Sequence, residues 1–291
     1  MSLTAEAIDS VVRAALAEDA PWGDLTSELL IPEAAVAVAS VVAREPGVLS
    51  GARVFAATIA AVDPSASVDL RVSDGSRFAA GDRIAAVSGS ARSILRAERV
   101  ALNLLQRMSG IATLTAEYVA LTEGTKARIV DTRKTTPGLR ALERDAVRAG
   151  GGHNHRFSLS DAVLAKDNHL AIMMAHGDLS LTDALLQLRS QVSHTAHLEV
   201  EVDRIDQIAP VLAAGVDTIM LDNFSLKDLR LGVDLIAGRA LIEASGGVTL
   251  ATVADIARTG VDLISVGALT HSVRSLDFGL DIEISATAAT T

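Results

Sequence analysis

Positively charged side chains gather in one segment of a chain that is otherwise acidic. Between Lys126 and Lys166 there are nine Lys or Arg residues and four Asp or Glu residues, whereas the whole 291-residue chain has a net charge of −10. Within this segment Arg133 and Lys134 precede Thr135-Thr136-Pro137-Gly138, so two cations stand beside hydroxyl groups and a turn. This combination suits a polyanionic small molecule better than a pair of solvated loop charges.

A second candidate segment is Gly150-Gly151-Gly152-His153-Asn154-His155-Arg156. The glycines let the backbone approach a ligand closely, and His155 and Arg156 can then donate hydrogen bonds to carboxylate or phosphate oxygens. The His-x-His pair also fits the start of a metal site, but no later strand-like run ends in histidine, as a further ligand would require. A plain flexible loop is the third interpretation.

Lysine and carboxylate side chains follow at the ends of later apolar runs. Lys166 is either a Schiff-base nucleophile or an anion contact, and the adjacent Asp167 favours the charged ammonium and hence the second role. Glu201 and Asp222 are either partners for the basic cluster or groups that serve ribose hydroxyls, a developing positive charge, or Mg²⁺ held partly through a substrate phosphate.

Glycines end the last two apolar runs, and one arginine lies in an unusual place. Ser245, Gly246 and Gly247, with Gly267 after the next run, stand where backbone N–H groups of a barrel bind phosphate. Arg99 lies on the apolar stripe of a predicted helix. It forms a salt bridge within the chain, extends its charged end to water along an apolar stem, or enters the pocket of a second subunit.

The second half of the chain has the pattern of βα units. Short apolar runs alternate with amphipathic stretches, and the last four units recur about every 21 to 24 residues. The runs cover 127–130, 162–165, 198–202, 218–221, 240–242 and 263–266. Because strand ends converge on one mouth of a β/α barrel, the candidate residues would face one pocket. Six strands predict a barrel that is open or incomplete.

The first half predicts a different architecture. Apolar spacing indicates a helix over 4–18 with Thr4 as its cap. Strand-like stretches at 36–44, 67–72 and 83–88 predict a small antiparallel sheet. Two helices, 92–107 and 111–122, are expected on either side of Ser109-Gly110.

Composition excludes several classes of protein. The chain has no cysteine, so it has no disulfide and no thiolate, which fits a cytoplasmic protein. No apolar run is long enough to span a bilayer, so no membrane partner is expected. The acidic charge, with one Trp and one Tyr, argues against nucleic-acid binding.

The motifs together resemble the quinolinate phosphoribosyltransferase family (nicotinate-nucleotide pyrophosphorylase, carboxylating). The likeness covers nearly the whole chain and is most specific in the second half. It rests on Arg96-Ala-Glu-Arg99, 131–140, 150–156, 159–169, 199–203, Leu221-Asp-Asn-Phe224, 243–247 and 266–272. His153 departs from the pattern, which has an apolar residue there more often.

The resemblance implies an α/β sandwich domain over 1–110, an open TIM-like β/α barrel over 111–274, and a tail over 275–291 that returns to the first domain, with a frayed end from Ser285. It implies a homodimer that makes nicotinate mononucleotide from quinolinate and phosphoribosyl pyrophosphate with Mg²⁺, without an organic cofactor or a protein cage for the metal.

The resemblance also implies roles for the candidate residues. Arg133, His155 and Arg156, with Arg99 from the partner subunit, would grip the quinolinate carboxylates. Lys134 and Lys166 would contact the anionic substrates, and Glu201 and Asp222 would serve the ribose and its Mg²⁺-pyrophosphate. Ser245, Gly246, Gly247 and Gly267 would seat the 5′-phosphate. Lys134, Lys166, Glu201 and Asp222 are the expected catalytic groups.

Three alternatives stay open from sequence. One is a molybdenum-associated paralogue with the same phosphoribosyl pocket and a different acceptor. The second is a Schiff-base aldolase that uses Lys166. The third is a phosphometabolite-binding protein without turnover.

Overall fold

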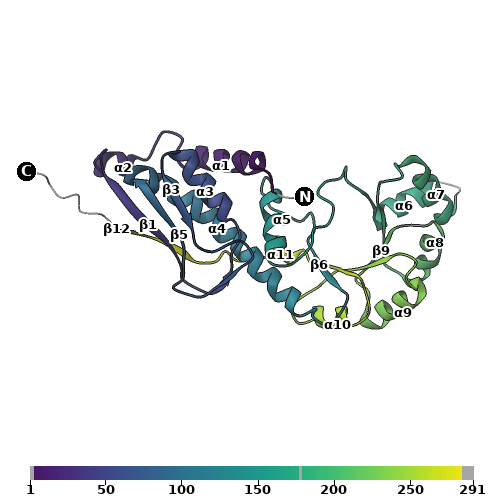
Figure 1. Ribbon diagram of the computed structural model, residues 1–291. Helices are drawn as coiled ribbons and strands as arrows, with labels where there is room; N and C mark the ends of the chain where they lie inside the picture. Colours follow the sequence, from purple (N-terminus) through teal and green to yellow (C-terminus); the bar gives the residue numbers. More distant parts are fainter. Residues whose placement is uncertain (1–2, 177–178, 284–291) are drawn as a thin grey trace, which may run out of the picture. The chain divides into compact units, whose positions relative to one another are not determined.

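The computed structural model describes residues 3 to 176 and 179 to 283 (Figure 1), so the frayed end expected from Ser285 lies outside the described residues. The chain divides into two compact units. Unit 1 comprises residues 1–116, 135–151 and 272–291, and unit 2 comprises 117–134 and 152–271.

Unit 1 is built on a four-stranded antiparallel sheet in the order β12-β1-β5-β3. The strands are β12 (Phe278–Glu283), β1 (Val36–Ala43), β5 (Arg83–Ser90) and β3 (Ser67–Leu70). The antiparallel sheet predicted from the first half of the chain is therefore confirmed. Its fourth strand comes from the other end of the chain, and Figure 1 shows it beside β1. A separate small pair joins β2 (Gly47–Val48) to β4 (Arg77–Phe78).

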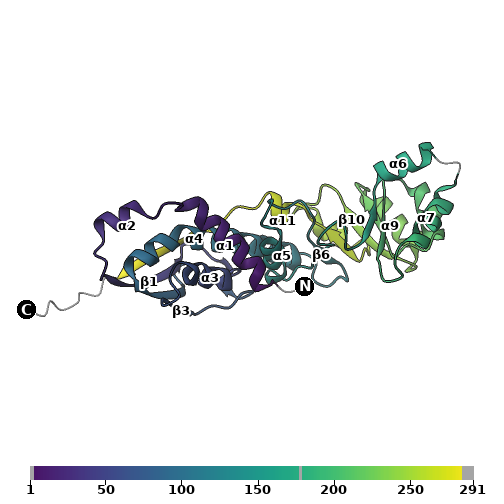
Figure 2. The same cartoon turned by 90° about the horizontal axis from the view of Figure 1, so that it is seen from above.

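Two helices, α3 (Ala52–Val62) and α4 (Ala91–Ala120), pack against this sheet, and α1 (Ala5–Asp19) packs on α3. Unit 1 also contains α2 (Leu25–Leu30) and α5 (Arg140–Ala149). The Thr4 side chain accepts a hydrogen bond from the Ala7 N–H at 3.2 Å, so the predicted cap of the first helix is confirmed. Phe55 and Ile59 of α3 and Leu102 of α4 pack with β1 and β5 in one apolar core, and Figure 2 shows these helices alongside the sheet.

The helix α4 is one continuous element, where the sequence predicted two. Ser109-Gly110 indicated a break, but both residues serve packing. The Ser109 hydroxyl accepts from Ser50 N–H and donates to the Ser50 carbonyl, both at 3.1 Å. A Cβ on Gly110 would lie 2.2 Å from the carbonyl oxygen of Arg274, so only glycine allows this approach. Because Ser109 and Gly110 are small, the backbone at Ser50 and at Arg274 can lie directly against α4.

Unit 2 is an open, wholly parallel sheet of six strands in the order β6-β11-β10-β9-β8-β7. The strands are β6 (Arg128–Val130), β7 (Val163–Ala165), β8 (Leu198–Val202), β9 (Thr218–Asp222), β10 (Leu241–Ser245) and β11 (Leu263–Ser265). The order ends at β6 and β7, so the predicted open α/β barrel is confirmed. Strand β10 extends three residues beyond the predicted 240–242, which places Glu243 inside the strand.

Helices line the outside of the barrel sheet. They are α6 (Asp167–His176), α7 (Leu181–Gln191), a 3₁₀ turn (Ile205–Gln207), α8 (Ile208–Ala213), α9 (Leu226–Ile236), α10 (Val253–Ala257) and α11 (Ala268–His271). Figure 1 shows α6 to α10 in a row around the strands. This arrangement leaves the carboxyl ends of the strands free for a site. Of the helices in the described residues, none combines the length and the apolar character needed to cross a membrane.

Candidate functional site

A cavity of about 610 Å³ opens at the carboxyl ends of the unit 2 strands. Ten of the residues predicted from sequence line it, which are Arg133, Lys134, His155, Arg156, Lys166, Glu201, Asp222, Ser245, Gly246 and Gly247. Thr132, Leu164, Met220, Asn223, Glu243 and Ser265 complete the lining. Residues far apart in sequence thus meet because parallel strands end at one edge.

Two predicted site residues do not line the cavity. Gly267 lies just outside the lining, where a Cβ would be 3.2 Å from Cδ of Lys134. Arg99 belongs to unit 1, where its side chain is exposed on α4. Burial raises the pKa of Glu98, and the positive charge of Arg99 opposes that rise. The role of Arg99 stays a prediction from the sequence.

Two arginines line the cavity close to each other, and the carboxylates of Glu199 and Asp161 act on one of them, Arg156. Burial lowers the pKa of Arg156, and the nearby Arg133 guanidinium lowers it further. Nε of Arg133 is buried and has no hydrogen-bond partner among the described residues. An anion bound here would accept a hydrogen bond from Nε of Arg133 and would offset the positive charges of both guanidinium groups.

Asp131 fixes the segment that carries His155 and Arg156. This carboxylate is fully buried at the end of β6, where it accepts from Asn154 Nδ2 at 2.6 Å and from the His155 N–H at 2.7 Å. The backbone of His153 pairs with Val130 as a short bridge, while its side chain is exposed. The unusual histidine therefore leaves the backbone of the loop in place.

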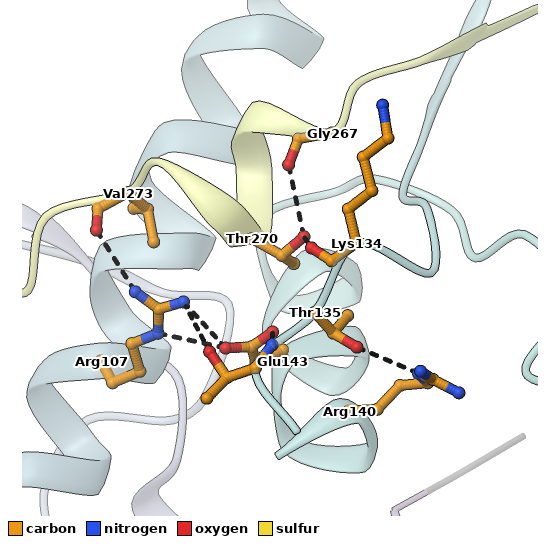
Figure 3. A network of polar contacts seen from close by, with 9 residues as sticks. Arg107, Lys134, Thr135, Arg140, Glu143, Gly267, Thr270 and Val273 are labelled. Carbon is orange, nitrogen blue, oxygen red and sulfur yellow. Dashed lines mark hydrogen bonds and ion pairs between the residues drawn. The ribbon is translucent and has the colours of Figure 1, made fainter. Parts of the chain in front are cut away.

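Lys134 is held by a contact within unit 2 that Figure 3 shows. The Thr270 hydroxyl donates to the Lys134 carbonyl oxygen at 2.8 Å, and the Thr132 hydroxyl accepts from the Lys134 N–H at 3.1 Å. These bonds anchor the main chain and leave the ammonium for a ligand. Figure 3 also shows a structural pair within unit 1, in which Arg107 Nη2 donates to Glu143 Oε1 at 2.8 Å.

Lys166 is paired with a carboxylate of the next strand. Its ammonium lies 2.8 Å from Oε2 of Glu201. The sequence pointed to Asp167 as the stabilising carboxylate, which is wrong, because Asp167 begins α6 and is exposed. The ion pair argues against the Schiff-base alternative, which requires an uncharged amine.

A tight turn places Asp222 beside the glycines that end β10. Asn223 has φ 57°, donates from Nδ2 to Asp222 at 2.7 Å, and donates its N–H to the Ser245 carbonyl at 2.9 Å. A Cβ on Gly246 would lie 2.2 Å from Oδ1 of Asn223. Glycine at 246 is therefore required for this turn.

Two family models together match most of the chain. The model for the N-terminal domain of quinolinate phosphoribosyl transferase matches residues 24–109, and the model for its C-terminal domain matches 111–281. The chain belongs to the quinolinate phosphoribosyltransferase family.

Known members are similar over their full length. The chain is 44% identical to a nicotinate-nucleotide pyrophosphorylase [carboxylating] of Mycobacterium leprae over 95% of this chain and 98% of that one. It is 42% identical to a probable enzyme of the same name from Bacillus subtilis, over 92% and 91%. The structure of NadC from Streptococcus pyogenes superposes with a TM-score of 0.93 at 41% identity, covering 98% and 99%. These names do not favour the molybdenum-associated alternative.

Within this family framework, sequence reasoning assigned no role to three polar residues at or below the cavity. In the sequence, Asn223 belongs to the motif Leu221-Asp-Asn-Phe224, but nothing there indicated a separate role for it. Glu243, which lines the cavity, and Glu199 are both buried beside His155. The alternation Glu199-Val200-Glu201 is the available signal for Glu199, because residues two apart on a strand share a face.

Proposed function

We propose that this quinolinate phosphoribosyltransferase family member transfers the phosphoribosyl group of phosphoribosyl pyrophosphate to quinolinate. The products are nicotinate mononucleotide, CO₂ and pyrophosphate, and the reaction is a step of de novo NAD synthesis. The observation that carries the proposal is that Arg133 and Arg156 line one cavity at the strand ends, where Nε of Arg133 is buried without a hydrogen-bond partner among the described residues. A planar dicarboxylate supplies two anions for two such groups.

The second substrate fits the other side of the cavity. Ser245, Gly246 and Gly247 offer backbone N–H groups to the 5′-phosphate, and Lys134 offers an ammonium to the phosphates. Breaking the bond from C1 to pyrophosphate builds positive charge on the ribose, and the carboxylates of Asp222 and Glu201 stabilise that charge. The quinolinate nitrogen then forms the new bond to C1, without a covalent enzyme intermediate.

Loss of CO₂ follows from the new bond. The ring nitrogen becomes positively charged, so the electron pair left at C2 when the carboxylate departs is stabilised before C2 takes a proton. The residues around the ring contribute orientation and exclusion of water. Arginine contacts to both carboxylates keep the nitrogen directed at C1.

The residues at the mouth fit Mg²⁺ brought by the substrate. Glu201 and Asp222 are the carboxylates that would contact it, and Glu201 already pairs with Lys166, which suits a metal held mainly by pyrophosphate oxygens. When bound, Mg²⁺ neutralises the leaving group.

The assay for the proposal supplies quinolinate, phosphoribosyl pyrophosphate and Mg²⁺ and follows nicotinate mononucleotide and CO₂ together. We expect equal amounts of both products from quinolinate and no reaction with nicotinate. Binding of phosphoribosyl pyrophosphate without turnover would instead identify a phosphometabolite-binding protein. Turnover with another acceptor alone would identify the paralogue.

We further propose that the enzyme is a homodimer in the cytoplasm, in which Arg99 of one subunit completes the site of the other. Arg99 is exposed, and apolar side chains of Trp22, Leu25 and Leu29 are exposed on unit 1, as an interface requires. The absence of cysteine fits the reducing compartment.

Mixing variants tests the shared site. Arg99→Ala and Arg133→Ala are each expected to be nearly inactive, and a re-equilibrated mixture is expected to regain activity, because hybrid dimers contain one intact site. Sedimentation establishes the oligomeric state. A monomer, or a mixture without recovered activity, would contradict the shared site.

A further inference from the structure

Three side chains lie together as a layer at the floor of the cavity, and the proposed reaction leaves two of them without a role. They are His155 from the segment between α5 and β7, Glu199 from β8 and Glu243 from β10. His155 Nε2 lies 3.1 Å from Oε2 of Glu199 and 3.7 Å from Oε1 of Glu243. A second cavity, of about 350 Å³, is lined by the same three residues together with the first residues of β9, β10 and β11. The layer therefore lies between the two ends of the barrel.

Both ring nitrogens of His155 are engaged by the protein. Nδ1 accepts a hydrogen bond from the Arg156 N–H at 2.8 Å, which requires an unprotonated nitrogen. The proton of the ring is therefore on Nε2, which donates it to Glu199. Burial lowers the pKa of His155, but the hydrogen bond to Glu199 and the nearby carboxylates raise it above its usual value. The backbone N–H at Nδ1 opposes a second proton on the ring.

Each of the two glutamates has one buried oxygen for which the described residues supply no hydrogen-bond donor. These atoms are Oε1 of Glu199 and Oε1 of Glu243. One oxygen of each acid lies within 4.8 Å of the other and of the His155 nitrogen. Two adjacent buried negative charges are unfavourable, whereas one shared proton satisfies both acids. Burial and the neighbouring Glu199 raise the pKa of Glu243 to about 8, although His155 and Ser265 oppose the shift.

We propose that Glu199 is a positioning residue: it accepts the Nε2 hydrogen of His155, holds the ring as its Nε2–H tautomer beside Glu243, and thereby fixes the main chain at Arg156. The role implied for His155 by family resemblance then changes, because no ring nitrogen is left to grip a carboxylate. The dicarboxylate is received by Arg133 and Arg156, while His155 sets the direction of Arg156. The kinetic consequences rest on the proposed function, but the tautomer does not.

The tautomer is tested on the unmodified full chain by ¹⁵N NMR of histidine-labelled protein. His155→Asn assigns the signal by its disappearance. We expect an Nε2–H pattern that stays unchanged when quinolinate is added. An Nδ1–H or doubly protonated ring at neutral pH would overturn the proposal, whether or not the chain turns over quinolinate.

Kinetics of amide variants test the positioning role. Oε1 of Glu243 lies 3.7 Å from Nε2, beyond hydrogen-bond distance, so we expect the quinolinate KM of Glu243→Gln to stay within about threefold of the parent value. Glu199→Gln replaces the carboxylate that accepts the Nε2 hydrogen with an amide. We expect it to raise the quinolinate KM by about tenfold or more, with the KM for phosphoribosyl pyrophosphate nearly unchanged. Glu123→Gln, on an exposed glutamate of the same unit, is the matched control.

Other outcomes separate the proposal from its rivals. Equal losses in both amide variants, or a loss in kcat alone, would overturn it, because neither follows when Glu199 alone is within hydrogen-bond distance of Nε2. A stoichiometric divalent ion in the purified chain that Glu243→Gln removes would also overturn it and identify the layer as a metal site. If the parent chain shows no turnover, the proposed function has failed, and the NMR result alone decides the tautomer.

Discussion

The antiparallel sheet of unit 1 and the parallel sheet of unit 2 bury different kinds of side chain. In unit 1 the inward positions of β1 are small and apolar, and Phe55 and Leu102 of the covering helices close the core. In unit 2 the strands carry Glu199, Glu201 and Glu243 at buried positions. Buried carboxylates lower stability unless they are paired or protonated, whereas apolar packing stabilises directly.

This difference indicates that the core of unit 1 mainly stabilises the fold, whereas the cavity of unit 2 holds the reactive groups. Unit 1 has the composition of a scaffold, and its buried charges, such as Glu143 with Arg107, are paired with each other. Unit 2 keeps charges oriented toward a cavity, where Lys166 and Glu201 are within reach of a ligand. Substitutions in the unit 1 core should therefore affect unfolding, and substitutions at the unit 2 cavity should affect turnover.

The largest effect is expected in the unit 1 core. Phe55 is fully buried in the apolar cluster, so Phe55→Ala should lower the free energy of unfolding by about 3 to 5 kcal/mol through lost contacts and a cavity. Denaturant titration measures the loss, and Phe55→Leu should lose less. If kcat/KM of the folded variant fell by more than its stability explains, the separation of the units would be wrong.

The next effect concerns the cavity. Arg133→Ala should lower transition-state binding by about 1.5 to 3 kcal/mol, because it removes a charge-assisted contact to substrate. The melting temperature should hardly change. Steady-state kinetics and thermal unfolding measure the two quantities, with Arg13→Ala on the exposed face of α1 as the control. Normal kinetics would remove Arg133 from the site.

A smaller effect is the pH dependence of stability in unit 2. The pKa of Glu243 is raised from 4.5 to about 8 in the folded chain, so the folded state binds an extra proton between these values. Stability from this group is therefore fully present below about pH 4.5 and is lost as the pH rises to about 8, by at most about 1.4 kcal/mol per pH unit. Denaturant titrations at several pH values should show this slope in the parent chain and not in Glu243→Gln. The same slope in both proteins would assign it to another group.

The smallest effect is expected at the cap of α1. Thr4→Ala removes the side-chain acceptor for the Ala7 N–H and should lower the free energy of unfolding by about 1 kcal/mol without changing kcat/KM. Thr4→Ser should keep most of the cap. A change in kcat/KM would mean that α1 contributes to the site as well as to the scaffold.

Local pattern was enough to predict much of the fold. The parallel strands of unit 2 were recognisable because each is a short apolar run between amphipathic helices, and their ends carry Arg133, Lys166 and Asp222. The strand predicted at 240–242 ended too early, because a charged residue such as Glu243 usually follows a buried strand and does not lie within it. Burial of that acid beside Glu199 is a property of the packed barrel.

Long-range contacts could not be predicted from local pattern. The pairing of β12 with β1 joins the two ends of the described chain, and no turn or period connects them. Ser109-Gly110 had the composition of a break, yet its small side chains let Arg274 approach a continuous helix. Such contacts depend on what packs against a residue from elsewhere in the chain.

The sequence by itself determined the two architectures, the open barrel, the family and the set of groups at the strand ends, because periodicity and motif order are local properties. The tertiary structure alone decided which charges pair. Glu201 and not Asp167 meets Lys166, and Glu199 and Glu243 lie together against His155. The physical reason is that ion pairing and burial depend on distances between strands, which the order of residues along the chain does not specify.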